Sequence, residues 1–95
     1  VEVSVELAEA YRLEAPYPNP FNPQTSFTLA VRRPQEIRVE VYDALGRRVA
    51  VLFAGVLEAG RSRRFVWEAS SASGNYFIRV QGEDFAAVRR VTLLR

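Results

Sequence analysis

The chain has 95 residues, which is enough for one domain with a single hydrophobic core. It contains neither cysteine nor histidine, and this excludes disulfides, cysteine metal sites and a conventional catalytic triad. The net charge of +2 is modest, and all 13 basic residues are arginine, which indicates a bias in composition and not a surface tuned to one partner.

From this composition we expect no enzyme activity and no cofactor. No apolar run approaches the roughly 20 residues that span a membrane. Residues 1–10 are predicted to be a linker that follows an upstream domain, and residues 11–95 are predicted to form the folded domain.

A stretch rich in proline precedes the first predicted strand. In APYPNPFNPQTSF (residues 15–27), four prolines within eight positions remove backbone donors and exclude both a helix and a complete sheet ladder. The side chains of Asn19 and Asn22 can cap bends, and Phe21 is expected to hold the segment on the core. We interpret the stretch as a rigid connection into a β-domain, with a proline-rich linker as the alternative. The structural residues predicted here are Pro18, Pro20, Phe21 and Pro23.

From residue 25 onward, apolar side chains recur at every second position, which is typical of strands buried on one face. Strands are predicted at 25–31 and 37–43, and on the second of them Arg38 and Glu40 are expected to face water. A tight turn at 43–47, in which Gly46 takes a positive φ, leads to a strand at 48–53 that is apolar on both faces. Residues 54–60 are predicted to be a loop.

The second half of the chain continues the same pattern. A strand at 61–68 carries Trp67 as a core anchor, and a strand at 75–80 directs Tyr76 inward. The last strand, at 85–94, is less regular, and a bulge is expected near Arg89 and Arg90. Six or seven short strands at intervals of about 8–12 residues predict an all-β fold, a β-sandwich.

Few residue clusters suggest chemistry. Glu83 and Asp84 are neighbours at a predicted hairpin tip, where we expect solvated turn residues and no calcium site. The four arginine pairs do not converge, and acidic neighbours dilute their field, so no nucleic-acid partner is expected. A carbohydrate platform needs exposed aromatic rings, and only Tyr42 and Phe77 fall outside the predicted core faces.

Five motifs together resemble a known family. YPNPFNPQTSF, VYDALGRRVAVL, RRFVWEA, SGNYFIRV and RRVTLLR occur in this order. The chain resembles the C-terminal sorting domain of the type IX secretion system, which overlaps in sequence with the immunoglobulin-like domain of flagellar hook-capping proteins. The resemblance covers about residues 11–95 and implies an immunoglobulin-like antiparallel β-sandwich of about seven strands. Members commonly carry lysine in the final strand, where this chain has Arg89, Arg90 and Arg95, which keep the charge but change the donor geometry.

The resemblance implies a sorting signal that is covalently attached to an N-terminal cargo domain. Such cargo reaches the periplasm through an ordinary export signal. The type IX translocon and an outer-membrane shuttle protein then carry it to the cell surface or the medium. There a sortase-like peptidase can remove the domain and attach the cargo to a surface lipopolysaccharide. The expected module is a monomer without cofactor.

Recognition by the machinery is predicted to lie at the end of the last strand and on two nearby loops. The predicted recognition residues are Arg90, Arg95, Asn19, Asn22, Gly74 and Asn75. Arg90 and Arg95 are expected to project from the sheet as charged side chains that a receptor can bind. Two other functions stay open at this point: a structural spacer or hook-cap-like assembly domain, and a carbohydrate-binding accessory module.

Overall fold

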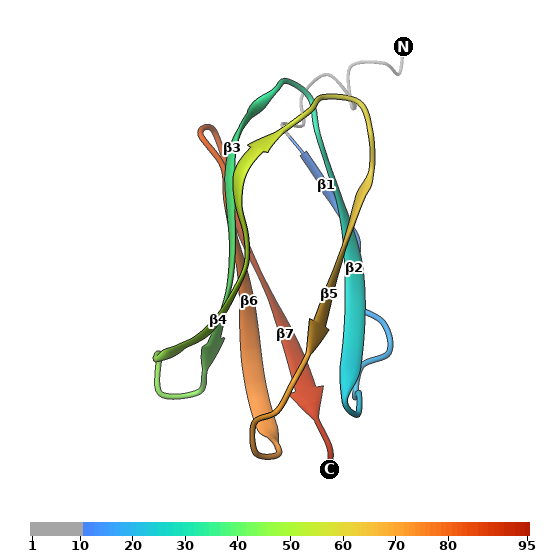
Figure 1. Ribbon diagram of the computed structural model, residues 1–95, viewed down its shortest axis with the longest axis vertical. Coiled ribbons are helices and arrows are strands. Elements are labelled where there is room, and N and C mark those ends of the chain that lie inside the picture. The colour runs from blue at the N-terminus through green and yellow to red at the C-terminus, as the bar shows by residue number, and fades with distance from the viewer. Residues whose placement is uncertain (1–10) are drawn as a thin grey trace.

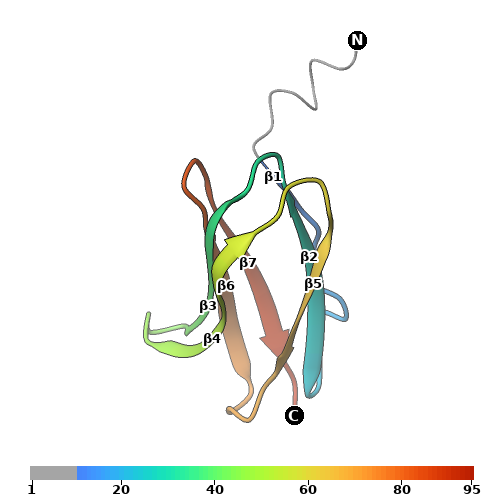
Figure 2. The ribbon, with the colours of Figure 1, turned by 45° about the horizontal axis from the view of Figure 1, so that its top comes forward.

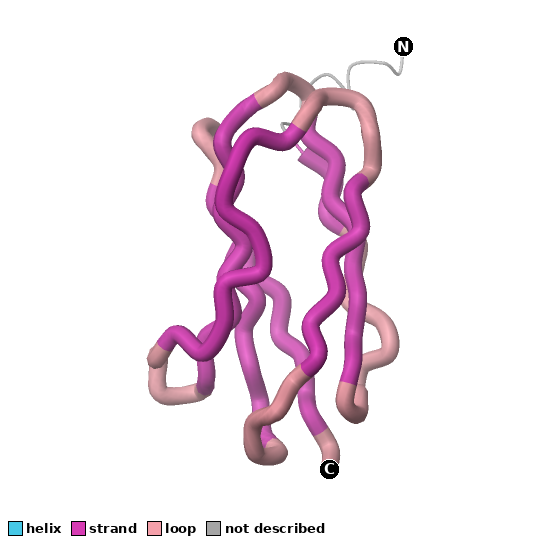
Figure 3. Tube along the Cα trace, in the orientation of Figure 1, coloured by secondary structure: helices cyan, strands magenta, loops and turns pink. Residues whose placement is uncertain are grey.

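The structure is a computed structural model that describes residues 11–95, and the predicted linker at 1–10 lies outside these residues. Within them, seven strands form two antiparallel sheets that face each other, and the connections are loops without a helix (Figures 1, 2 and 3). This confirms the predicted all-β sandwich. The three-stranded sheet has the order β1 (Tyr11–Leu13), β2 (Gln24–Val31), β5 (Arg63–Glu68). The four-stranded sheet has the order β4 (Arg48–Leu57), β3 (Gln35–Asp43), β6 (Gly74–Gln81), β7 (Ala86–Leu93).

The connections have an immunoglobulin-like pattern. The chain crosses between the sheets after β2, after β4 and after β5, so that β2 pairs with β5 and β3 pairs with β6. In Figure 1, the β2–β3, β4–β5 and β6–β7 connections lie at the upper end of the sandwich. The β3–β4 hairpin, the β5–β6 loop and the C-terminus lie at the lower end (Figure 1).

The core fills the space between the two sheets. Successive side chains of a strand point to opposite faces, so the apolar residues at every second position all point inward. Six of them are completely buried: Leu29, Val39, Val41, Val80, Val91 and Leu93. At the lower end the ring of Trp67 lies 5.5 Å from that of Phe21 and 5.2 Å from that of Tyr76, measured between centroids. Each such aromatic pair contributes about 0.5–1.5 kcal/mol beyond its buried area.

The structure corrects the predicted strand boundaries in the β3–β4 hairpin. Strand β4 continues to Leu57, through residues that were predicted to be a loop. The reason is that β3 begins at Gln35, and its first residues pair with this continuation, with Ile37 opposite Gly55. Two irregularities in the ladder, between Val39 and Glu40 and between Val41 and Tyr42, adjust the longer strand to the shorter one.

The bulge expected near Arg89 and Arg90 is absent from the β6–β7 ladder, whose register is continuous from end to end. The irregular sequence pattern has another cause. Ala87 is the buried residue, whereas Val88 is 53% exposed. Arg89 follows Ala87 on the inward face, and its guanidinium donates a hydrogen bond of 3.5 Å to the carbonyl oxygen of Leu13 in β1. Strand β1 itself was not predicted as a strand.

The upper end is closed by a packed cap. The ring of Phe85 stacks on that of Tyr11, with centroids 4.2 Å apart. The side chain of Gln35 is buried here, where it donates to the carbonyl of Arg33 and accepts a hydrogen bond of 2.9 Å from the backbone N–H of Glu83. Gly82 leaves room for both side chains, because a β-carbon there would overlap the ring of Phe85 and lie 2.7 Å from Oε1 of Gln35.

Gly82→Ala should therefore destabilise the fold by about 1–3 kcal/mol, since the Phe85 ring must leave its stack on Tyr11. The matched control is Gly55→Ala, where the new β-carbon makes an ordinary 3.5 Å contact with the ring of Phe53. The control should be unchanged or more stable by up to about 1 kcal/mol. Urea unfolding of the parent and both variants measures the difference. Equal stabilities for the two variants would contradict the role of the cap.

Candidate recognition surface

Two of the predicted recognition residues, Asn19 and Asn22, lie in the proline segment, residues 14–23, which joins β1 to β2. Its first half continues the pairing with β2, and Tyr17 exchanges backbone hydrogen bonds of 2.8 and 3.1 Å with Ser26. Its second half leaves that sheet and lies parallel to β7 of the other sheet, with Phe21 opposite Leu93. The segment, drawn in light blue beside β2 in Figure 1, thus connects the edges of both sheets.

Asn19 binds the free edge of β7 through its side-chain amide. Nδ2 donates to the carbonyl of Arg90 (3.1 Å), and Oδ1 accepts from the backbone N–H of Thr92 (3.0 Å). Two residues later, Phe21 donates to the carbonyl of Thr92 (2.9 Å) and accepts from the N–H of Leu94 (3.0 Å). Four successive polar groups on the edge of β7 are therefore paired. The side chain of Asn19 supplies a donor that the flanking prolines lack in their backbone.

The prolines of this segment act as rigid acceptors. The carbonyl of Pro18 accepts a hydrogen bond of 2.8 Å from the buried hydroxyl of Thr25, and the carbonyl of Pro23 accepts one of 2.8 Å from the N–H of Ala69. Pro20 separates Asn19 from Phe21, whose ring is 2% exposed. A proline fixes its own φ, so the residues that carry the contacts are held with little loss of backbone freedom on folding.

Three predicted recognition residues meet around Thr92. Asn19 contacts its backbone, Asn75 accepts a hydrogen bond of 2.8 Å from its hydroxyl, and Arg90 is the next residue on the same face of β7. Asn22 is exposed in the proline segment and is not brought into this group by a hydrogen bond in the part of the chain that the structure describes.

Arg95 lies at the lower end and is held by the β5–β6 loop. Its guanidinium donates to the carbonyls of Ser71 (2.6 Å) and Ala69 (3.0 Å), and its backbone N–H donates to Oγ of Ser73 (2.8 Å). The side chain is exposed, yet it is bonded to the loop and does not extend freely into solvent. Gly74, at the end of this loop, opens β6 with a φ of 154°.

Gly46 lies away from this group, at the tip of the β3–β4 hairpin, with a φ of 85° that a side chain would strain. Asp43 organises the tip, because its carboxylate accepts hydrogen bonds of 2.9 Å from the backbone N–H groups of Arg47 and Leu45. The bond from Arg47 is the main cause of a pKa of Asp43 below its ordinary value of 3.8.

Glu40 was expected to face water, and the structure contradicts this: Glu40 is 5% exposed. It does lie on the outer face of the four-stranded sheet, but other side chains cover it. The hydroxyl of Tyr42 donates to Oε1 (2.8 Å), while the guanidinium groups of Arg38 (3.1 Å) and Arg48 (3.0 Å) donate to Oε2. The bond from Tyr42 lowers the pKa of Glu40, burial opposes this, and the two arginines lower it further. In the sequence, Arg38, Glu40 and Tyr42 recur at every second position, and this pattern was the available indication that their side chains contact one another.

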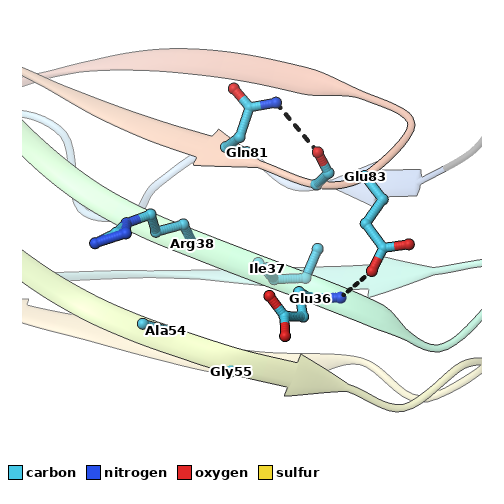
Figure 4. Close-up of a pocket in the computed structure, with 8 residues that line it drawn as sticks. Glu36, Ile37, Arg38, Ala54, Gly55, Gln81 and Glu83 are labelled. Atoms are coloured by element: carbon cyan, nitrogen blue, oxygen red, sulfur yellow. Dashed lines mark hydrogen bonds between the residues drawn. The ribbon is translucent and has the colours of Figure 1, made fainter.

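A shallow pocket of about 460 Å³ adjoins Arg38 near the upper end (Figure 4). It exists because Ala54 and Gly55 in β4 offer no large side chain beside β3. Its carboxylate from Glu83 is already engaged, since it accepts a hydrogen bond of 2.9 Å from the N–H of Glu36 and pairs with Arg33 at 3.2 Å (Figure 4 shows the first of these). The bond from Glu36 is the main cause of a lowered pKa of Glu83.

Among residues 11–95, no three acidic side chains gather closely enough to hold a metal ion. The same residues contain no helix that is long and apolar enough to cross a membrane. The polar side chains described above mainly tie loops and strand edges to one another.

The family model of the secretion system C-terminal sorting domain matches residues 15–93. The chain belongs to this family, the sorting domains of the type IX secretion system, and the predicted resemblance is confirmed. The module is therefore a sorting signal for an exported protein, with a destination at the cell surface or outside the cell. No curated protein matches the sequence.

From the hydrogen bonds that Glu40 accepts, we predict how the stability of the fold depends on pH. The folded-state pKa of Glu40 lies below its ordinary value of 4.5, so the carboxylate stabilises the fold at neutral pH, and this contribution is lost as the pH falls from about 4.5 through the folded-state pKa. Glu40→Gln should lower the melting temperature at pH 7, and the gap to the parent should close towards pH 3. The exposed Glu68→Gln serves as control and should show a small gap throughout. A gap for Glu40→Gln that is the same at pH 7 and pH 3 would contradict the assignment.

Proposed function

We propose that residues 11–95 are the folded sorting signal of a multidomain protein that the type IX secretion system carries across the outer membrane. The observation that carries the proposal is the family match over residues 15–93. The fold supports the proposal, because a sorting signal must fold in the same way whichever cargo is attached to it. Contacts within the domain close both ends of the sandwich: the packed cap closes the upper end, and Arg95 binds the β5–β6 loop at the lower end.

In this proposal the protein crosses the inner membrane by an ordinary export signal and folds in the periplasm. An outer-membrane shuttle protein and the translocon then recognise the sorting domain. A sortase-like peptidase removes the domain at the surface, and the cargo is released or attached to a surface lipopolysaccharide. The domain acts by being bound and has no catalytic part in these steps.

We place the recognised group around Thr92, where Asn19, Asn75 and Arg90 meet. Asn19 and Asn75 have hydrogen bonds to β7, so they hold the strand in position. The guanidinium of Arg90 projects from the exposed outer face, and only its backbone carbonyl is used by Asn19. Arg90 is therefore the residue of this group whose side chain is best placed to contact a receptor carboxylate.

The proposal predicts that the chain, fused to an exported reporter in a host with the type IX machinery, directs the reporter to the surface or the medium, while the bare reporter stays in the periplasm. The passenger should not matter. Arg90→Ala should lower export severalfold while leaving stability within about 0.5 kcal/mol, because the side chain is exposed. Arg95→Ala should cost about 1 kcal/mol, because two loop carbonyls lose their donor.

The matched control is Arg61→Ala, an exposed arginine in the β4–β5 loop, which should be exported like the parent. Cell fractionation measures export, and thermal unfolding measures stability. A parent fusion that remains periplasmic would contradict the proposed function. An Arg90→Ala fusion exported as well as Arg61→Ala would instead show that recognition lies elsewhere on the domain.

A further inference from the structure

One row of side chains crosses all four strands on the outer face of the four-stranded sheet. The ladder registers place Arg48 opposite Tyr42, Tyr42 opposite Phe77, and Phe77 opposite Arg90. Directly paired residues of antiparallel strands point to the same face. These four residues, the arginine–aromatic row, therefore form a line with two aromatic rings in the middle and a guanidinium at each end.

The row is accessible. Tyr42 and Phe77 are partly exposed, and the side chain of Arg48 is 50% exposed. The neighbouring row ends in Val51 and Val88, which are 48% and 53% exposed, so the face also offers apolar area beside the rings. Aromatic residues and arginine are the types most enriched in protein interfaces and among their energetic hot spots.

The row is also held in place. Glu40 lies beside it and accepts hydrogen bonds from Tyr42 and Arg48, so one buried carboxylate fixes a ring and a guanidinium at once. Side chains that are ordered before binding lose less conformational entropy in the complex. Glu40 is thus a positioning residue of this face.

The charge of the face indicates the chemistry of its partner. Four arginines lie on this face together with two carboxylates, Glu40 in the middle of β3 and Glu36 at its upper end. The four arginines are Arg38, Arg48, Arg79 and Arg90. An excess of guanidinium groups beside apolar rings favours carboxylates that are joined by an apolar portion.

The spacing of the charges decides between kinds of anion. Strands in a sheet lie about 4.8 Å apart, so the ends of a row across four strands are separated by about 14 Å. A compact phosphate needs donors that converge on one point, whereas these two arginines stand at opposite ends of an apolar strip. An extended peptide with acidic residues four positions apart spans about 13–14 Å and fits the row.

We propose that the arginine–aromatic row binds an acidic polypeptide segment of the secretion machinery, with two carboxylates on Arg48 and Arg90 and the apolar side chain midway between them over Tyr42 and Phe77. The identity of the partner as part of that machinery rests on the proposed function. The contact surface itself is a property of this sheet and is tested separately.

The first test titrates the isotope-labelled chain with the blocked peptide Asp-Val-Leu-Val-Asp at low salt and follows the backbone NMR signals. Shifts should concentrate at residues 42, 48, 77 and 90 and disappear at high salt. Arg48→Glu with Arg90→Glu should bind at least tenfold more weakly. Arg61→Glu with Arg12→Glu changes the net charge equally on other parts of the surface and should bind within about twofold of the parent.

Signal dispersion and the melting temperature establish that each variant is folded. The proposal is overturned if the peptide causes no shifts, if the shifts lie elsewhere, or if the two double variants bind equally. A peptide with adjacent acids, Asp-Asp-Val-Leu-Val, should bind more weakly than the spaced one, and equal binding would also count against the row.

The second test measures export of the reporter fusions. If the parent is exported and the Arg48→Glu, Arg90→Glu fusion stays periplasmic while the control double variant is exported, the surface is the one that the machinery binds. If both double variants are exported equally, the surface proposal fails and the sorting function stands. If the parent itself is not exported, the sorting function fails, and the peptide titration alone decides whether the row binds acidic segments.

Discussion

The pairing of Asn19 with the free edge of β7 is the contact on which the rest of this domain depends. A strand at the edge of a sheet exposes unpaired N–H and C=O groups, and these invite pairing with other chains. Here the amide of Asn19 and the backbone of Phe21 pair with four of those groups. The same contacts fix the path of the proline segment, which places the ring of Phe21 against Trp67 and closes that side of the core.

This arrangement limits how a receptor can meet the final strand. The inner face of β7 is buried, one edge is paired with β6, and the lower half of the other edge is covered by the proline segment. Its outer face, with Val88, Arg90 and Thr92, is the accessible part. A receptor that binds this strand therefore binds a surface that exists only in the folded domain. This agrees with a sorting signal that is recognised after folding.

Local sequence patterns were sufficient for the core and insufficient for long-range contacts. The alternation of apolar residues predicted the inward faces of β2, β3 and β6, because that period depends on the strand alone. The burial of Glu40 depends on Arg48, which reaches it only through the irregular β3–β4 ladder. The hydrogen bonds of Asn19 to β7 join residues that are separated by more than 70 positions in the sequence. The role of Gly82 could not be predicted, because it depends on the packing of Phe85 on Tyr11, which is more than 70 positions away in the sequence.

Hydrogen exchange of the backbone amides of Thr92 and Leu94 tests most directly whether the proline segment seals β7. Both amides face the outer edge of a terminal strand and would exchange quickly if that edge were open. We predict that they exchange as slowly as amides in the β3–β6 ladder, and that Asn19→Ala accelerates Thr92 severalfold while Asn22→Ala leaves it unchanged. Exchange of Thr92 and Leu94 in the parent as fast as that of amides on the free edge of β4 would contradict the account.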